Sequence, residues 1–353
     1  MKKIILTGGG TAGHVTPNIA LVPKLKEAGY TVEYIGSYNG MEKDLVENAG
    51  LKYYGISSGK LRRYFSLQNF TDPFRVIKGY FEAKKLMKEL KPDVLFSKGG
   101  FVTVPVVMAA HAAKVPAVIH ESDMTPGLAN KIATKFATKV CHTFPETGEY
   151  VGSKGVFTGS PIRAELFTGD KIIAMKMCDF DSSKPVLLVT GGSLGAKKVN
   201  DAIREALPEL LKTYQVAHLC GKEKYDKSLE GTKGYAQFEY ISAEMKDFFA
   251  MADIIVSRAG SNSICEIAAL HKPNVLIPLS AKVSRGDQIL NSKSFEKQGL
   301  SKVLDEDTMT TDTLVNAINE VYDKRADYID TMKNSNIGNG IDKIIDVIMS
   351  VSK

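Results

Sequence analysis

The sequence predicts an α/β protein with two doubly wound parallel-sheet domains that face a cleft. Near its start, KIILTGGGTAGHVTP places glycines between an apolar β-branched run and a helical pattern at residues 3–17. VLLVTGGSLGAKKVN repeats this arrangement at residues 186–200. In such loops the glycines let the backbone approach a ligand, and the helix N-terminus offers unpaired N–H groups to an anion. Two of them, each opening one half of the chain, indicate twin domains.

The composition is that of a soluble globular chain. Its 353 residues allow two separate cores, with 44% hydrophobic and 24% charged residues. No apolar run reaches the roughly 18 residues of a membrane span, and MKKIILTGGG enters a strand without a signal-type apolar segment. The four cysteines are scattered and form no C-x-x-C pair, which disfavours disulfides and a zinc site. These features favour the cytoplasm.

The first half alternates strands and helices, as a parallel sheet covered on both faces requires. A helix is expected at residues 16–28, with Pro17 in its first turn and Gly29 after its end. Another is expected near residues 41–49. Apolar runs predict strands at residues 3–7, 31–37, 93–97 and 117–120.

The second half repeats the scheme. The passage between domains is expected within VFTGSPIRAELF, residues 156–167, where glycine and proline interrupt the pattern. Residues 340–353 form an amphipathic helical pattern with four isoleucines on one face: Ile341, Ile344, Ile345 and Ile348. Strands are expected at residues 186–190, 215–220, 236–240, 254–257 and 274–278.

Positive charge is concentrated in one segment. The chain has a net charge of +6, and residues 60–91, with nine Lys or Arg against three acids, carry a local charge of +6 that equals it. Residues 65–90 mix aromatic and apolar residues with basic ones. Part of that apolar set would form core, but apolar residues rimmed by cations also fit an anionic membrane surface. Nucleic acid is disfavoured because no recognition motif accompanies the bases. The residues expected to contact the membrane are Phe70, Phe74, Arg75, Lys78, Phe81 and Lys85.

The first glycine loop formally matches the dinucleotide pattern G-x-G-x-x-G. A dehydrogenase would also need an acid at the end of the second strand, which instead ends in Gly36 and Ser37, so that function is disfavoured. His14 directly follows the loop, at a helix N-terminus that disfavours imidazolium. The ring is therefore expected to stay neutral near pH 7 and to accept a proton, although a polar loop residue without a catalytic role would look the same.

The segment ADIIVSRAGSNSICEIAALHKPNVLIP, residues 252–278, is the most specific stretch. A strand is expected to end at Ser257, and Ser261 is expected to open a helix whose N–H groups and hydroxyls can take a diphosphate. Glu266, a turn further in, can accept two hydrogen bonds from a ribose diol. The alternative is that Glu266 only complements the helix dipole.

Two acidic motifs invite a metal interpretation. DFD at residues 179–181 and DED at residues 305–307 both read D-x-D, a pattern that can hold a metal with a nucleotide. Both lie in polar, turn-like surroundings, so we expect solvated turns, no metal site and no cofactor. GGSLGA, residues 191–196, is the second glycine loop. Its Ser193 corresponds in position to Thr11 of the first loop, and its hydroxyl would lie at the N-terminus of a helix.

The chain resembles the MurG family of N-acetylglucosaminyltransferases of peptidoglycan synthesis over essentially its whole length. The resemblance rests on segments that occur in the family's order: GGGTAGHVTP, KGGFVTVPV, HESDMTPGLANK, GSPIR, GGSLGA, RAGSNSICEIAA and DQILN. It implies the GT-B architecture, with two Rossmann-like domains facing a cleft and a C-terminal helix that returns to the first domain. The N-terminal domain would comprise residues 1–160 and 336–353, and the C-terminal domain residues 161–335.

The resemblance also implies an activity. The enzyme would transfer GlcNAc from UDP-GlcNAc, with inversion and without a cofactor, to the 4-hydroxyl of undecaprenyl-pyrophosphoryl-MurNAc-pentapeptide. This converts lipid I to lipid II. The C-terminal domain would bind the donor, and the N-terminal domain would face the acceptor at the cytoplasmic face of the cell membrane, as a peripheral protein.

Site residues carry over by position. His14 would be the base, while Arg163 and helix N-termini would stabilise the leaving diphosphate. Glu266 would hold the ribose, and Ile241 the uracil through its backbone. The other donor contacts would be Thr11, Ala12, Gly13, Asp123, Ser193, Ser261, Asn262 and Gln288. The acceptor side would comprise Gly99, Gly100, Glu121 and Asn130.

Three segments depart from the family's common pattern. HESD replaces the usual HEQN, so Asp123 stands where the family has an amide. GGF replaces GGY, so Phe101 lacks a hydroxyl, and Ala12 stands where glycine is usual. These changes concern local sugar contacts more than the reaction.

Other functions remain open from the residues. Another GT-B lipid glycosyltransferase would share the Glu266 helix but lack the HESDMTPGLAN and GGF segments. A non-hydrolysing UDP-GlcNAc 2-epimerase is a further enzymatic option. A non-catalytic nucleotide-sugar-binding protein is disfavoured by His14 in the glycine loop.

Overall fold

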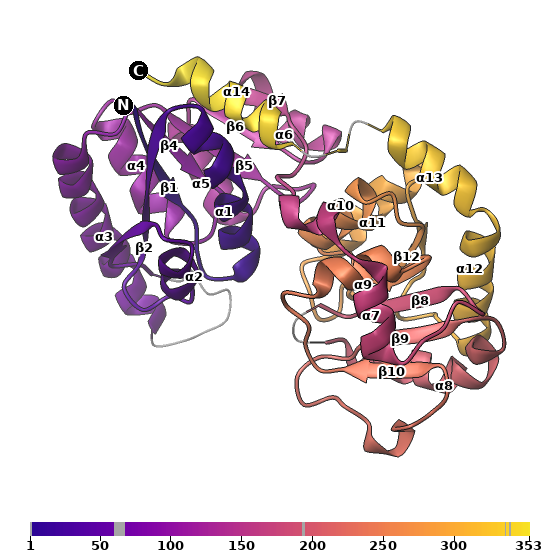
Figure 1. Ribbon diagram of the computed structural model, residues 1–353. Coiled ribbons are helices and arrows are strands. Elements are labelled where there is room, and N and C mark those ends of the chain that lie inside the picture. Colours follow the sequence, from indigo (N-terminus) through magenta and orange to yellow (C-terminus); the bar gives the residue numbers. More distant parts are fainter. Residues whose placement is uncertain (1, 60–67, 193–194, 336, 339) are drawn as a thin grey trace. The chain divides into compact units, whose positions relative to one another are not determined.

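The computed structural model describes residues 2–59, 68–192, 195–335, 337–338 and 340–353. The chain divides into two compact units (Figure 1). The N-terminal unit comprises Met1–Arg163 and Asn339–Lys353, and the C-terminal unit comprises Ala164–Gly338. The boundaries expected from the sequence lay after residues 160 and 335.

The N-terminal unit is built on a seven-stranded parallel sheet in the order β3-β2-β1-β4-β5-β6-β7. The four strands expected from apolar runs are confirmed as β1, β2, β4 and β5. Three short strands, β3, β6 and β7, were not expected. The strand bounds are β1 (Lys2–Thr7), β2 (Tyr30–Ser37), β3 (Lys52–Ile56), β4 (Val94–Ser97), β5 (Ala117–Glu121), β6 (Lys139–His142) and β7 (Gly155–Phe157).

Helices cover both faces of this sheet, because successive side chains of a strand point to opposite faces. Ile4 and Leu6 of β1 are buried in a core with α1 and α14, whereas Ile5 is buried in a second core with α3 and α4. The helix bounds are α1 (Ala12–Glu27), α2 (Glu42–Asn48), α3 (Gln68–Leu90), α4 (Thr103–Ala112), α5 (Leu128–Phe136), α6 (Gly148–Val151) and α14 (Ile341–Val351).

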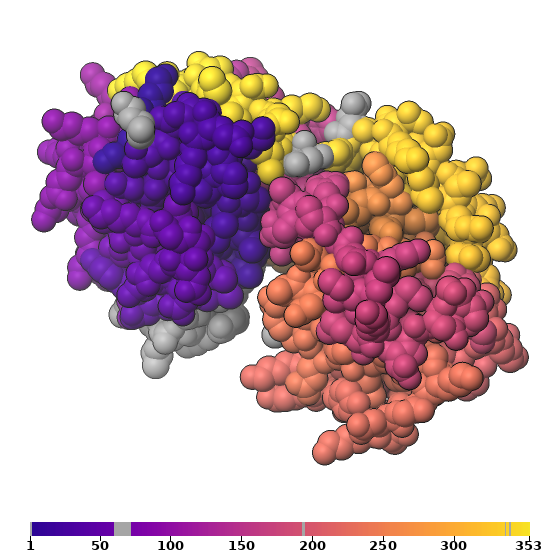
Figure 2. Space-filling model, viewed as in Figure 1, coloured from indigo at the N-terminus to yellow at the C-terminus, as the bar shows by residue number. Residues whose placement is uncertain are grey.

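The C-terminal helix α14 belongs to the N-terminal unit. Its predicted amphipathic face is confirmed, since all four isoleucines of that face are buried beside α1. Figure 2 shows the yellow atoms of the chain's end lying against indigo and violet atoms of this unit. None of the helices in the described part of the chain is both long and apolar enough to cross a bilayer.

The C-terminal unit has a six-stranded parallel sheet in the order β10-β9-β8-β11-β12-β13. The five expected strands are confirmed as β8 to β12, with β10 and β12 ending two residues earlier than expected. β13 was not expected. The bounds are β8 (Val186–Thr190), β9 (Gln215–Leu219), β10 (Tyr235–Phe238), β11 (Ile254–Ser257), β12 (Asn274–Leu276) and β13 (Lys302–Val303).

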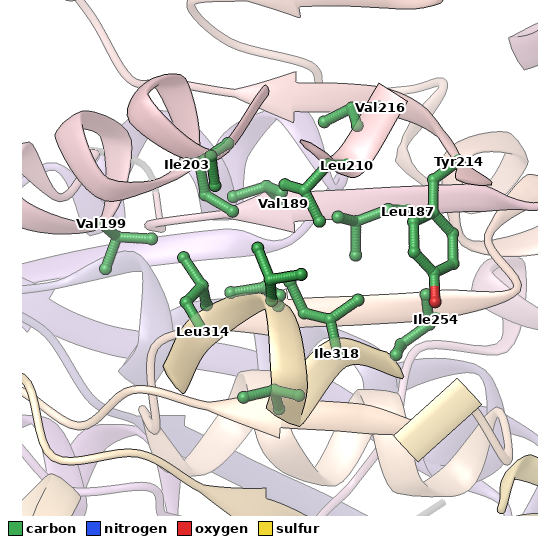
Figure 3. Close-up of a cluster of buried hydrophobic side chains, with 14 of the residues drawn as sticks. Leu187, Val189, Val199, Ile203, Leu210, Tyr214, Val216, Ile254, Leu314 and Ile318 are labelled. Carbon is green, nitrogen blue, oxygen red and sulfur yellow. The ribbon is translucent and has the colours of Figure 1, made fainter. Parts of the chain in front are cut away.

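The main core of this unit packs two helices on one face of the sheet. Leu187 and Val189 of β8 belong to one buried cluster with Ile203 of α8 and with Leu314 and Ile318 of α12 (Figure 3). The helix bounds are α7 (Lys171–Cys178), α8 (Lys197–Thr213), α9 (Met245–Met251), α10 (Ser261–Ala269), α11 (Asp287–Lys297), α12 (Thr311–Asp323) and α13 (Arg325–Asn334).

Candidate active site

The first glycine loop and the KGGF loop leave neighbouring strands, because Thr7 of β1 pairs with Ser97 of β4. Their backbones are in close contact: a Cβ at Gly100 would lie 2.2 Å from the carbonyl oxygen of Gly9. A Cβ at Gly10 would lie 2.5 Å from Cε1 of Phe101, and Gly10 and Gly100 have φ values of 88° and 91°. Glycine is therefore required on both sides of this contact.

His14 is the third residue of α1, which begins four residues before the expected start at residue 16. Its Nδ1 lies 3.1 Å from the Gly9 carbonyl oxygen and 3.0 Å from Thr11 Oγ1. Because a carbonyl oxygen only accepts, this contact requires a hydrogen on Nδ1 and leaves Nε2 as the acceptor nitrogen. Burial, and then the positive charge of Lys98, lower the pKa of His14. The direction agrees with the expected neutral ring, but burial rather than the helix is the main cause.

Lys98 and His120 form a buried pair that sequence reasoning did not identify. Lys98 Nζ lies 2.9 Å from Nδ1 of His120 and also donates to Ser122 Oγ. His120 Nε2 lies 2.9 Å from the Gly159 carbonyl oxygen. Burial, followed by the charge of Lys98, holds the pKa of His120 well below its ordinary value. The available signal was that Lys98 directly follows β4 and that His120 lies near the end of β5.

Glu121 and Asn130 hold the loop that follows β5. The Glu121 carboxylate accepts hydrogen bonds from the backbone N–H groups of Asp123 (2.9 Å) and Gly127 (3.2 Å). It also accepts one from Asn130 Nδ2 (2.8 Å). Burial and the nearby Asp123 raise the pKa of Glu121. Both side chains are largely buried, and their hydrogen bonds fix the shape of this loop. Their predicted contact with an acceptor stays a prediction.

A cavity of about 470 Å³ opens at the carboxyl ends of β2 and β3. The start of α3 contributes Arg75 and Lys78 to its lining, and Phe101 contributes its ring. Because Phe101 also contacts the first glycine loop, the cavity lies beside that loop. Ser57 and Ser58 also line it. The lining combines these two cations with the buried acid Asp72 and with apolar and aromatic side chains.

In the C-terminal unit, the second glycine loop and the N-terminus of α10 leave adjacent strands, since Thr190 of β8 pairs with Ser257 of β11. A Cβ at Gly195 would lie 2.0 Å from the Cys220 carbonyl oxygen, which requires glycine there. α10 begins at Ser261 as expected, and the side chain of Glu266 is half-buried one turn further in. Ser193 lies outside the described residues.

The other predicted donor residues lie in both units. Ile241 follows β10 at the same edge of the C-terminal sheet, and Gln288 is in the first turn of α11, where its Oε1 accepts from Leu279 N at 3.0 Å. Asp123 follows β5, and Arg163 is the last residue of the first N-terminal segment; both are partly buried.

DFD lies in a polar turn, as expected, whereas the central residue of DED, Glu306, is buried and pairs with Arg258. Asp181 accepts from Ser183 N at 2.8 Å. Asp307 accepts from Ser280 Oγ at 2.8 Å and pairs with Lys198 and Lys282, each at 3.2 Å. These contacts, led by the hydrogen bond from Ser280, lower the pKa of Asp307 to about 2. In the described ranges, no cluster of three or more His, Cys, Asp or Glu could hold a metal.

Helix α3 presents an exposed apolar and basic surface, the α3 face. Phe74, Ile77 and Phe81 have exposed fractions of 74%, 55% and 61%. The core interpretation is therefore wrong for these three, whereas Ala83 and Met87 on the same helix are buried. The side chain of Phe70 lies outside the described residues. The residues that define the α3 face are Phe74, Arg75, Ile77, Lys78, Phe81 and Lys85, all exposed.

Residues 4–142 match the model of the glycosyltransferase family 28 N-terminal domain, and residues 186–348 that of its C-terminal domain. A relative from Lachnospira eligens is 62% identical over 354 residues and covers 100% of both chains. One from Lachnoclostridium phytofermentans is 60% identical over 352 residues, 99% of each chain. Both are named UDP-N-acetylglucosamine–N-acetylmuramyl-(pentapeptide) pyrophosphoryl-undecaprenol N-acetylglucosamine transferase.

Solved structures agree with these matches. The crystal structure of MurG from Acinetobacter baumannii is similar with a TM-score of 0.79 and 25% identity, over 99% of this chain and 100% of that one. The UDP-GlcNAc 2-epimerase of Neisseria meningitidis, bound to UDP-GlcNAc, has a TM-score of 0.69 and 14% identity over 99% of this chain and 100% of the other. The second likeness concerns the fold alone.

Proposed function

The chain belongs to glycosyltransferase family 28, and on that premise we propose that it transfers GlcNAc from UDP-GlcNAc to lipid I. The acceptor is undecaprenyl-pyrophosphoryl-MurNAc-pentapeptide, and the product is lipid II of peptidoglycan biosynthesis. The observation that supports this most strongly is the 62% identity, over the full length of both chains, to a transferase named for this reaction. The architecture is GT-B, with two Rossmann-like domains.

The C-terminal unit supplies the donor site in this proposal. The second glycine loop and the N-terminus of α10 lie at the carboxyl edge of neighbouring strands, where α/β sheets bind nucleotides. Their backbone N–H groups, with Ser261 and Asn262, take the diphosphate. Glu266 accepts both ribose hydroxyls, and the backbone of Ile241 contacts the uracil. Gln288 completes the site from α11.

The N-terminal unit supplies the base. Nε2 of His14 takes the proton of the acceptor 4-hydroxyl while its oxygen attacks the anomeric carbon of GlcNAc. The bond from that carbon to the diphosphate breaks, so the configuration inverts and UDP leaves. Arg163 and helix N-termini balance the negative charge on the leaving diphosphate. The lowered pKa of His14 supports this role, because the ring is neutral near pH 7.

The α3 face is the membrane-docking surface in this proposal. The undecaprenyl tail of the acceptor stays in the bilayer, since each buried CH₂ contributes about 0.8 kcal/mol. Exposed Phe74, Ile77 and Phe81 insert among the lipids, while the neighbouring cations meet anionic head groups. The protein then binds peripherally at the cytoplasmic face of the cell membrane, where UDP-GlcNAc is present.

The deciding experiment incubates the purified protein with UDP-GlcNAc and a short-chain lipid I analogue. We expect release of UDP together with a disaccharide product in which GlcNAc is β-linked to the 4-hydroxyl of MurNAc. Retention of the anomeric configuration, or epimerisation of UDP-GlcNAc without transfer, contradicts the proposal. The epimerase outcome is a real alternative because proteins with that activity share the fold.

A further inference from the structure

The carboxylate of Glu42, the first residue of α2, is buried against the first glycine loop. Its exposed fraction is 0%. One oxygen, Oε1, accepts from Ser37 N at 3.0 Å and from Ser37 Oγ, and the other, Oε2, accepts from Gly10 N at 3.3 Å. No Lys, Arg or His within the described ranges forms an ion pair with it. Burying a carboxylate without a cation is costly, so these three donors are its compensation.

Two glycines leave the space that this carboxylate occupies. A Cβ at Gly9 would lie 2.6 Å from Glu42 Oε1, and a Cβ at Gly40 would lie 2.2 Å from both oxygens. A larger residue at either position would displace the carboxylate. The loop and the Glu42 side chain are thus fitted to each other, which a helix-terminal acid that only complements the dipole would not require.

One peptide group connects Glu42 to His14. The carbonyl of Gly9 and the N–H of Gly10 belong to the same planar unit. Its carbonyl oxygen lies 3.1 Å from Nδ1 of His14, and its N–H donates to Glu42 Oε2 at 3.3 Å. A hydrogen bond at one end of a peptide group polarises it and strengthens the bond at the other end.

We propose that Glu42 is a positioning residue for His14, acting through the Gly9–Gly10 peptide group. By fixing the plane of that peptide, Glu42 keeps the Gly9 carbonyl aimed at Nδ1–H and so keeps the acceptor lone pair on Nε2. This inference rests on the proposed function, in which Nε2 takes the proton of the acceptor hydroxyl. Carboxylates that hold the Nδ1–H of catalytic histidines directly have the same purpose; here a peptide group stands between them.

The proton balance of the step needs no further reactant. The proton moves from the acceptor hydroxyl to Nε2, and the resulting imidazolium keeps its Nδ1–H bond to the Gly9 carbonyl. Three charged groups act on that imidazolium: Glu42 on α2 and Asp123 after β5 favour it, whereas Lys98 after β4 opposes it. Glu42 never touches the substrate in this scheme.

The test compares Glu42→Gln with Glu47→Gln, a control at an exposed position of the same helix. An amide offers one acceptor oxygen where three donors converge, so Glu42→Gln leaves at least one N–H facing an NH₂ group. We expect kcat to fall about tenfold or more, within the range that general-base help supplies. The KM for UDP-GlcNAc should stay within about twofold, because the change affects the transition state.

Nitrogen NMR of His14 provides the readout that a purely structural role would not move. The wild type should show the Nδ1–H tautomer, and Glu42→Gln a mixture of tautomers. In the double variant with His14→Ala, the loss of kcat should equal that of His14→Ala alone, because Glu42 acts through His14.

Each outcome decides one point. A wild-type ring in the Nε2–H tautomer overturns the proposal even if Glu42→Gln fails to fold. An unchanged tautomer and kcat in a folded Glu42→Gln variant overturns it as well. Near-wild-type turnover of His14→Ala shows that His14 is not the base. Glu42 then has no catalytic role through the Gly9–Gly10 peptide group, whichever tautomer the ring adopts.

Discussion

Lys98 Nζ lies 2.9 Å from Nδ1 of His120, and both side chains are buried at the carboxyl ends of neighbouring strands. An ammonium group only donates, so His120 accepts at Nδ1, donates to the Gly159 carbonyl from Nε2, and stays neutral. The same ammonium group lowers the pKa of His14. Lys98, to which the sequence analysis gave no role of its own, therefore acts on two histidines of the N-terminal unit.

Lys98→Met should move the acid limb of the kcat profile to higher pH. Lys98 lowers the pKa of His14, so removing its charge raises that pKa, although burial continues to lower it. Because the base must be neutral, kcat at about pH 6 should then fall relative to kcat at about pH 8. The profile is measured on a soluble acceptor, with Lys131→Met, at an exposed position of α5, as the control. An acid limb at the same pH as in the wild type would show that Lys98 does not affect the pKa of the base.

His14→Ala should lower kcat by about 10²-fold or more, as expected for lost general-base help. Donor affinity should be largely retained, because the predicted ribose contact, Glu266, and the predicted diphosphate contacts of α10 lie in the other unit. Turnover and UDP-GlcNAc binding are measured side by side, with His111→Ala, an exposed histidine on α4, as the control. Turnover close to that of the control would remove His14 from the mechanism.

Glu266→Ala should raise the KM for UDP-GlcNAc strongly. Two ribose hydroxyls would lose their acceptor, and hydrogen bonds to charged groups contribute roughly 1.5–3 kcal/mol each. The effect should appear in donor binding by calorimetry as well as in steady-state kinetics. Glu205→Ala, at an exposed position of α8, is the control. Equal donor affinity in the two variants would show that the ribose assignment is wrong.

The sequence predicts the strands that have continuous apolar runs and misses strands that lack them. β3, β7 and β13 lie at sheet edges and are mostly half-buried, so their side chains form no such run. Gly13 disfavours a helical first turn, so α1 was expected at residue 16, although Thr11 is its N-cap and the helix begins at Ala12. That error concerned the surroundings of His14, which lies inside the helix rather than before it.

The parts of the site that the sequence could not predict depend on distant contacts. The hydrogen bond from Gly10 to Glu42 joins residues 32 positions apart, and that from Lys98 to His120 joins residues 22 positions apart. Each depends on which strands are neighbours in the sheet. Read along the chain, Glu42 is an ordinary acid in the first turn of a helix. The glycines of both loops were predictable because a tight strand–helix junction needs positive φ or close backbone approach, and glycine alone allows both without a steric penalty.

Reversing the charge of the α3 face should separate membrane binding from catalysis. The triple variant Arg75→Glu, Lys78→Glu and Lys85→Glu should weaken binding to anionic vesicles by roughly 1 kcal/mol per residue. Lys78 and Lys85 pair with Glu82 and Glu89 at 3.9 and 3.8 Å, but such exposed pairs are weak, so folding should survive their loss.

The control for this variant reverses three exposed lysines far from α3 in the sequence: Lys26, Lys293 and Lys297. UDP-GlcNAc binding and turnover of a short-chain, water-soluble acceptor should persist in both variants, while turnover of vesicle-embedded acceptor should fall only in the α3 variant. Since Arg75 and Lys78 also line the cavity beside the first loop, equal loss on soluble and embedded acceptors would assign them to acceptor binding instead.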